Sequence, residues 1–315
     1  MRRRLLALIL GLSMTTACGA GSETRVTTPE AGGPSREAST EVELGEATDA
    51  LALLSRLDDA WRDKDCATVE RLTTWAERAL GGRACEATRN GRPAPARKSY
   101  SVAELYLPGT VGEDRWFVAL AREPDPAYFL FVQEGGEWRL GAGPIPIRGE
   151  IREPTEGAVP ADDPSVGVKA RLVPQRYLAY LTDPAGVSGV TFPKGDPARD
   201  LFGDLVRRPQ SVRPDRLTTE VRLLVGPQRA LLLPGGGALV IHALEIEHRQ
   251  RAREGRSALA RPLYGKADLR GFTGRTRTAR LTGTEVVLVA TEIMGKGAEL
   301  ATTGLRRGLA TLTAD

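Results

Sequence analysis

Residues 116–140, WFVALAREPDPAYFLFVQEGGEWRL, decide the fold class of the first half of the chain. Apolar runs at Trp116–Ala121, Tyr128–Val132 and Trp138–Leu140 are rich in aromatic and aliphatic side chains and short enough to be strands. Gly135-Gly136 lies between the last two runs and predicts a tight turn. Together with an earlier run over residues 100–107, this pattern predicts an antiparallel sheet.

Two helices are expected before the sheet. Apolar residues recur every three or four positions from residue 53 to 61 and again from 69 to 80. Asp65 is placed to cap the second helix and Gly81-Gly82 to end it. The recurring positions are Leu53, Leu54, Leu57, Ala60 and Trp61 in the first helix, and Val69, Leu72, Ala76 and Leu80 in the second.

The order of helices followed by an antiparallel sheet, the Trp61 to Asp65 spacing and the Phe131–Leu140 hairpin resemble the nuclear-transport-factor-2-like or cystatin-like superfamily. The resemblance covers residues 47–147. It implies an α+β fold in which a curved sheet wraps a helix to form a cone. Proteins of this superfamily often bind ligands or partners.

The second half repeats the plan in its order of elements. Helical segments are expected around residues 172–181 and 201–206, the latter ended by Pro209, and strands at 221–225, 230–233, 238–247 and 285–291. We therefore expect two consecutive cone-like α+β domains, the alternative being one unrelated α+β domain in the second half. This arginine-rich half resembles a group of uncharacterised lipoproteins from high-GC Gram-positive bacteria, the actinobacteria.

The first eighteen residues resemble the leader of a bacterial lipoprotein. Arg2 to Arg4 form a positive region, an apolar run follows to Met14, and small residues lead to Cys18. The stretch up to Ala17 would span roughly 20 Å as a helix, too short to cross a hydrocarbon core of roughly 30 Å. We expect a signal peptide over residues 1–17 and lipid, including palmitate, on Cys18. A plain secretory signal is the alternative.

A lipidated Cys18 leaves Cys66 and Cys85 as an even pair. In an oxidising compartment outside the cytoplasmic membrane, we expect them to form a disulfide bond. A straight helix would hold the two residues about 28 Å apart, so the chain must fold back between them, and Gly81-Gly82 is the expected place. Two separately buried thiols are the alternative.

Low-hydrophobicity stretches divide the chain. Residues 18–46 are rich in Gly, Ser, Thr, Glu and Pro and are expected to form a disordered tether on the outer face of the cytoplasmic membrane. Residues 148–164 contain three prolines and several acids and are expected to form a linker. The predicted domains are therefore residues 47–147 and 165–315.

Charge does not indicate a nucleic-acid-binding protein. The formal net charge of +4 includes three leader arginines, so the exported chain carries about +1. Residues 207–280 hold sixteen Lys and Arg against six acids, which could form a basic face toward anionic lipid or a wall polymer. A solvated surface is the simpler explanation.

No catalytic or metal motif converges in the sequence. His242 and His248 lie in or beside one predicted strand, about 20 Å apart, and cannot share a metal ion. Gly235-Gly236-Gly237 is placed as a turn between strands, and of Asp58 and Asp59 at most one can face a cavity. We expect no cofactor and no resident metal.

Ten of the sixteen aromatic residues fall within residues 61–138. In a cone-shaped fold, Trp61, Tyr100, Phe117 and Phe129 could line a ligand pocket, although core packing explains them equally well. We expect a noncatalytic binding or scaffold module for a small ligand, a wall polymer or an envelope protein. The alternative is a small-molecule enzyme, which a buried carboxylate in a pocket near Tyr100 or Tyr128 would favour over a filled cone.

Overall fold

The computed structural model describes residues 42–108, 115–155, 157, 165–227, 229–294 and 299–315. The predicted signal peptide, Cys18 and most of the predicted tether lie outside these residues. The first helix begins at Leu44, within the segment predicted as tether. The N-terminal elements are α1 (Leu44–Ala50), α2 (Ala52–Arg62), α3 (Cys66–Leu72), α4 (Trp75–Arg89), β1 (Ser101–Tyr106), β2 (Trp116–Glu123), β3 (Ala127–Glu134) and β4 (Glu137–Pro146).

The second half also places helices before strands. Its elements are α5 (Gly167–Leu181), α6 (Pro197–Ser211), β5 (Arg216–Leu223), β6 (Arg229–Leu233), β7 (Gly237–Arg251), α7 (Lys266–Thr273), β8 (Arg280–Met294) and β9 (Glu299–Ala314). Helix α6 runs past Pro209, where the sequence predicted its end. Helix α7 and strand β9 were not predicted from the sequence.

Two antiparallel sheets confirm the predicted α+β class. The first has the order β1-β2-β3-β4, with the predicted hairpin at Gly135-Gly136, where φ is 62° and 82°. The second has the order β5-β7-β8-β9, and β6 pairs with β7 across the predicted Gly235–Gly237 turn. Both hairpin turns thus lie where the glycines predicted them.

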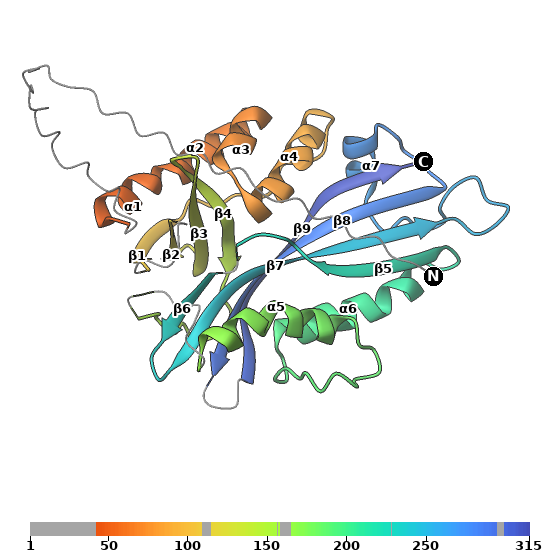
Figure 1. Ribbon diagram of the computed structural model, residues 1–315. Coiled ribbons are helices and arrows are strands. Elements are labelled where there is room, and N and C mark those ends of the chain that lie inside the picture. Colours follow the sequence, from red (N-terminus) through yellow and green to blue (C-terminus); the bar gives the residue numbers. More distant parts are fainter. Residues whose placement is uncertain (1–41, 109–114, 156, 158–164, 228, 295–298) are drawn as a thin grey trace, which may run out of the picture. The chain divides into compact units, whose positions relative to one another are not determined.

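The two sheets pack against each other and each carries helices on its other face (Figure 1). On β2, Phe117, Ala119 and Ala121 face the helices α1–α4, whereas Val118 and Leu120 face the second sheet. Helices α5 and α6 cover the far face of the second sheet. Because both faces of the central strands are buried, their sequences are continuously apolar rather than alternating.

The two predicted domains share one hydrophobic core. The described residues from 42 to 315 form one compact unit, and a single cluster joins Leu120 and Leu130 of the first sheet to Leu239 and Leu288 of the second. The described part of the predicted linker also contacts the second sheet, since the Arg148 amide donates to the Thr303 carbonyl at 2.7 Å. The two halves of the chain are therefore parts of one packed body over the described residues from 42 to 315.

The chain turns at Thr73-Thr74 and not at Gly81-Gly82, so that part of the sequence prediction was wrong. Thr73 and Thr74 are extended, and the Thr74 amide donates to the Leu140 carbonyl at 2.9 Å. β-Branched side chains favour extended backbone, and pairing with β4 supplies a partner that a continuous helix would not need. Gly81 and Gly82 lie inside α4.

The turn brings α3 and α4 together and confirms the disulfide between Cys66 and Cys85, whose Cα atoms are 5.5 Å apart. Cys66 is the first residue of α3, and the side chain of Asp65 caps that helix by accepting from the Thr68 amide, as predicted. Cys85 lies within α4 rather than beyond its end. On the chain-entropy model, closing this loop contributes roughly 3 kcal/mol.

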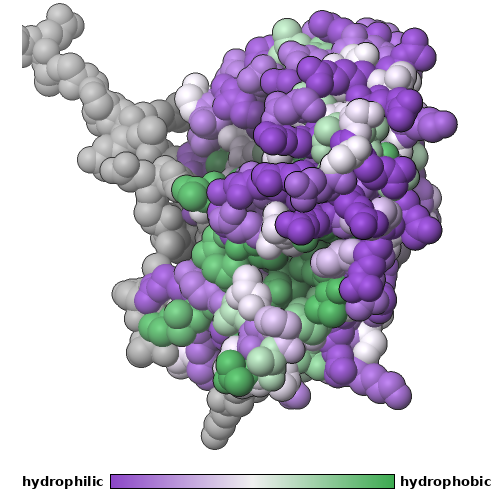
Figure 2. Space-filling model, turned by 90° about the vertical axis from the view of Figure 1, so that its right-hand side faces the viewer, coloured by the Kyte–Doolittle hydropathy of each residue, from purple (hydrophilic) through white to green (hydrophobic). Residues whose placement is uncertain are grey.

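The surface of the described residues has both hydrophilic and hydrophobic areas. On the face in Figure 2, hydrophilic residues cover the upper part, and hydrophobic residues gather in a band lower down. Exposed apolar side chains of α5 and α6 include Val168, Leu172 and Val206. Single exposed apolar residues are common on folded proteins and need no partner to explain them.

Candidate functional site

A cavity of about 320 Å³ lies where the N-terminal helices, the first sheet and β9 meet. Its walls come from α2, α4, the ends of β3 and β4, and residues 306–309 of β9, and an irregular segment from Arg92 to Lys98 borders it. This volume is at the lower end of the range for small-molecule sites. The lining residues are Leu54, Asp58, Trp61, Thr73, Glu77, Leu80, Gly81, Ala84, Arg92, Pro93, Pro95, Ala96, Arg97, Lys98, Tyr100, Phe129, Leu140, Pro144, Arg306, Arg307, Gly308 and Leu309.

Three of the four predicted pocket residues line this cavity. Trp61 comes from α2, Phe129 from β3, and Tyr100 immediately precedes β1. The rings of Tyr100 and Phe129 meet edge to face, with centroids 5.1 Å apart. Phe117 does not reach the cavity: it is fully buried, stacked on Phe131 at 4.7 Å. The same face of β2 that made Phe117 a candidate is filled by the helices, so core packing explains that residue.

Glu77 places a buried carboxylate in the cavity. It lies in the first turn of α4, where the helix dipole favours negative charge, and its side chain is 9% exposed. Its Oε1 accepts a hydrogen bond from the Gly143 amide at 3.0 Å and pairs with the Arg306 guanidinium. Burial raises the pKa of Glu77, and the positive charge of Arg306 and the Gly143 N–H oppose that rise.

A bulge in β4 frees the Gly143 amide for Glu77. Gly143 and Pro144 stand between the paired residues Ala142 and Ile145, where the ladder with β3 shifts register. The φ of Gly143 is +136°, and an added Cβ would lie 2.7 Å from the Phe129 ring. Glycine is required here because a side chain would have to displace an aromatic wall of the cavity.

Arg306 reaches the cavity from the second half of the chain. It donates to Oε1 of Glu77 and, at 2.8 Å, to the Gly143 carbonyl. Its neighbour Arg307 turns to the opposite face of β9 and pairs with Glu285 and Asp204. Successive residues of a strand point to opposite faces, so the two arginines bind different layers of the protein.

Ion pairs hold the segment from Arg92 to Lys98 against the body. Arg92 donates to Asp268 of α7 at 2.7 Å and lies over the Phe272 ring. Arg97 pairs with Asp58 of α2, and Lys98 pairs with Asp125. Asp58 therefore faces the cavity, whereas Asp59 is exposed and pairs with Arg62. These bonds neutralise the cationic groups around the cavity.

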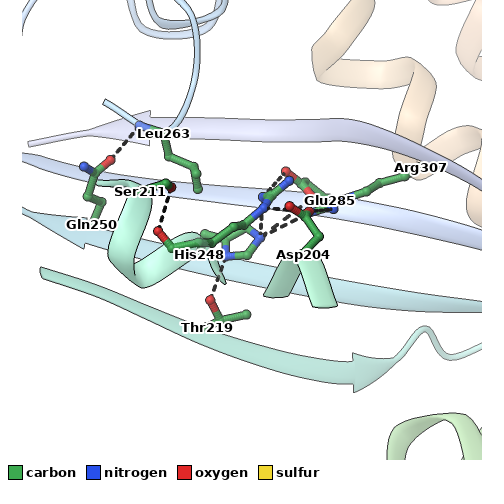
Figure 3. Close-up of polar contacts among 9 residues, drawn as sticks. Asp204, Ser211, Thr219, His248, Gln250, Leu263, Glu285 and Arg307 are labelled. Carbon is green, nitrogen blue, oxygen red and sulfur yellow. Dashed lines mark hydrogen bonds and ion pairs between the residues drawn. The ribbon is translucent and has the colours of Figure 1, made fainter. Parts of the chain in front are cut away.

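A second polar cluster lies between α6 and the second sheet (Figure 3). Glu285 of β8 pairs with Arg208 of α6 and Arg307 of β9, and both arginines also pair with Asp204. His248 of β7 is fully buried beside them, with Nε2 3.8 Å from a Glu285 oxygen. At first sight, a histidine between a carboxylate and the hydroxyl of Thr219 looks like a catalytic triad.

The hydrogen bonds of His248 exclude that role. Arg208 is only a donor and lies 2.9 Å from Nε2, so Nε2 must accept and the ring proton must be on Nδ1. Nδ1 then donates to Thr219 Oγ1 at 2.8 Å. A nitrogen that already carries its proton cannot remove one from Thr219. This cluster joins α6 to the sheet and is structural.

His242 also has a buried, non-catalytic setting. It stacks edge to face on Tyr177, and desolvation lowers its pKa to about 3. Within the described ranges, no group of three His, Cys, Asp or Glu side chains is placed to hold a metal ion. Among the same residues, no helix is both long and apolar enough to span a membrane.

Glu77 and Arg306 were not predicted as site residues. The available signal was a carboxylate on the inward stripe of a predicted helix, between Ala76 and Leu80, three residues after Thr74. Arg306 had no local signal because its partner is 229 residues away.

No protein-family model, curated protein or solved structure matches this chain.

Proposed function

We propose that this chain is an extracytoplasmic lipoprotein, anchored through lipid on Cys18, whose body binds a small molecule without transforming it. The observation that carries the proposal is the cavity between Trp61, Tyr100 and Phe129, whose charged neighbours are neutralised by one another. Apolar walls with a few fixed polar groups are typical of ligand sites. The resemblance to ligand-binding cone folds supports the same role.

Filling the cavity tests this function. Leu80 lines it from α4, so Leu80→Trp should occlude it and abolish binding of a neutral aromatic probe, methoxynaphthalene, measured by calorimetry. Ala84→Leu fills the same space with a smaller change if the larger one disturbs folding. Leu172→Trp is the matched control because Leu172 is 49% exposed on α5. Absence of probe binding to the wild type, or equal binding to Leu80→Trp, would contradict the proposal.

Membrane attachment has its own test. Lipid on Cys18 would add two or more acyl chains, which attach a protein stably where one chain is marginal. Cys18→Ser should therefore release the protein into the medium or leave an uncleaved precursor, as shown by fractionation and intact mass. Unchanged fractionation and mass would contradict the anchor and leave the ligand site unaffected.

A small-molecule enzyme is the second candidate, because Glu77 is a buried carboxylate in the same cavity as Tyr100. Its raised pKa is typical of a general base. The binding function is preferred because the Arg306 guanidinium and the Gly143 N–H both stabilise the charged form of that carboxylate, which weakens it as a base. Incubation with an envelope extract separates the two functions. An enzyme would consume more than one molar equivalent of some component, and its Glu77→Gln variant would not. A binding protein would remove at most one molar equivalent.

A further inference from the structure

One oxygen of Glu77 is left for a ligand. Both hydrogen bonds to this carboxylate, from the Gly143 amide and from Arg306, end on Oε1. Among the described residues, Oε2 has no hydrogen-bond partner, although the residue is only 7% exposed and lines the cavity. Oε2 is accessible from the cavity, so a ligand donor can reach it, and a hydrogen bond to a charged acceptor is stronger than one to a neutral acceptor.

The charges around the cavity favour a neutral ligand. Glu77 is balanced by Arg306, and Asp58 by Arg97. Arg92 and Lys98 are paired with Asp268 and Asp125 outside the lining. A ligand carboxylate or ammonium would lose its hydration without finding an unmatched opposite charge, and burying an uncompensated charge is strongly unfavourable.

The walls of the cavity determine the chemistry of the rest of the ligand. Trp61, Tyr100 and Phe129 present ring surface on one side, and Leu54, Leu80 and Leu140 present aliphatic surface. Burial of apolar ligand surface against these residues supplies affinity, whereas Oε2 of Glu77 supplies orientation.

We propose that the cavity selects a neutral small molecule in which an apolar body carries a hydroxyl donor, with the hydroxyl on Glu77 Oε2 and the body against Trp61, Tyr100 and Phe129. This inference rests on the proposed binding function and names its ligand class. A neutral hydroxyl is preferred to an ammonium because Arg306 already neutralises Glu77.

Three probes that share one ring system test the class: naphthol, methoxynaphthalene and naphthoate, substituted at the same position. Calorimetry on the full exported chain at neutral pH should show naphthol binding about tenfold more tightly than methoxynaphthalene, since only naphthol can donate a hydrogen bond to the charged carboxylate. Naphthoate should bind more weakly than either. The methoxy group differs from the hydroxyl by lacking the donor.

Glu77→Gln tests which atom is responsible. With the amide oxygen kept on the Gly143 and Arg306 donors, the amide nitrogen takes the place of Oε2 and offers a donor in place of an acceptor. The preference for naphthol should then fall to within about twofold, while methoxynaphthalene affinity is unchanged. Glu220→Gln is the matched control: it makes the same chemical change at an exposed residue of β5 outside the cavity and should leave the preference intact.

The outcomes separate the two proposals. If the wild type binds no probe, the proposed function fails and this inference with it. If methoxynaphthalene binds as tightly as naphthol, or naphthoate binds best, the cavity binds ligands but the inferred class is wrong. If Glu77→Gln keeps the tenfold preference, Oε2 is not the acceptor and the inference is overturned. Should that variant fail to fold, the wild-type ranking decides.

Discussion

Glu285 shows how a buried charge can depend on its partners. Its side chain is 7% exposed and pairs with Arg208 and Arg307. Burial alone would raise the pKa of Glu285, but its contacts with His248 and the two arginines outweigh burial and hold that pKa at about 2. Removing one member of a buried pair leaves the others uncompensated and typically costs more than the pair ever contributed.

We therefore expect Glu285→Gln to lower the free energy of unfolding by about 3 to 5 kcal/mol at neutral pH. Urea unfolding of wild type and variant measures this difference. Glu220→Gln is the matched control, since Glu220 is 51% exposed and pairs with Arg222 and Arg249 at 3.8 Å. An exposed pair contributes about 0 to 1 kcal/mol, so equal losses in both variants would contradict the argument.

The sign of the pH dependence follows from the lowered pKa of Glu285. The folded protein binds this proton less readily than the unfolded chain, so the stabilisation is complete above the ordinary pKa of 4.5. It is lost as the pH falls from about 4.5 toward about 2. The stability difference between wild type and Glu285→Gln should narrow over that interval, because protonated Glu and Gln carry the same charge.

At the scale of helices and strands, the clearest wrong prediction was a helix end at Gly81-Gly82. A glycine pair predicts a helix end when only local propensity is considered, but α4 continues through it because the helix packs on the first sheet and is tied to α3 by the disulfide. Helices α3 and α4 are separated instead at the two threonines before Trp75, and the extended backbone there depends on pairing with Leu140 of β4. That pairing is a tertiary contact and has no local sequence signal.

Because α4 continues through both glycines, we expect alanine to have different effects on stability at Gly82 and at Gly81. At Gly82 an added Cβ meets nothing within 4 Å, so Gly82→Ala should raise the free energy of unfolding by about 0.4 to 1 kcal/mol. At Gly81 the same atom would lie 3.0 Å from a methyl group of Val69, so Gly81→Ala should gain less or destabilise. Thermal unfolding of both variants measures this, and a destabilising Gly82→Ala would indicate that the helix ends there after all.

Strand β9 shows what periodicity alone cannot reveal. Leu305-Arg306-Arg307-Gly308-Leu309 does not alternate apolar and polar residues, because both faces of the strand make polar contacts, with Glu77 on one side and Glu285 on the other. The strands of the first sheet and the disulfide were predictable, since their signals are local or follow from cysteine count. The cavity wall formed by β9 was not, because its partners are distant in sequence.

At the scale of the whole molecule, the layers explain why the cavity needs both halves. Its aromatic walls come from the N-terminal half, while Arg306 and Gly308 come from β9. An added Cβ at Gly308 would lie 2.7 Å from Leu80, so the strand approaches α4 closely. The order of elements predicted two similar halves; it could not predict that their sheets would pack face to face.

Limited proteolysis tests this association. Residues 148–164, predicted as a linker, are the expected site of cleavage, and two independent domains would separate once the chain is cut there. Because the sheets share one hydrophobic cluster and Glu77 pairs with Arg306, the two fragments should remain together after cleavage. The nicked protein should elute as one species on size exclusion in native buffer and show two bands on a denaturing gel. The same sample in urea, where buried apolar surface no longer holds the halves, should separate. Separate elution of two folded fragments in native buffer would instead establish independent domains, and the cavity between them would then open on cleavage, so that methoxynaphthalene binding should be lost at the same time.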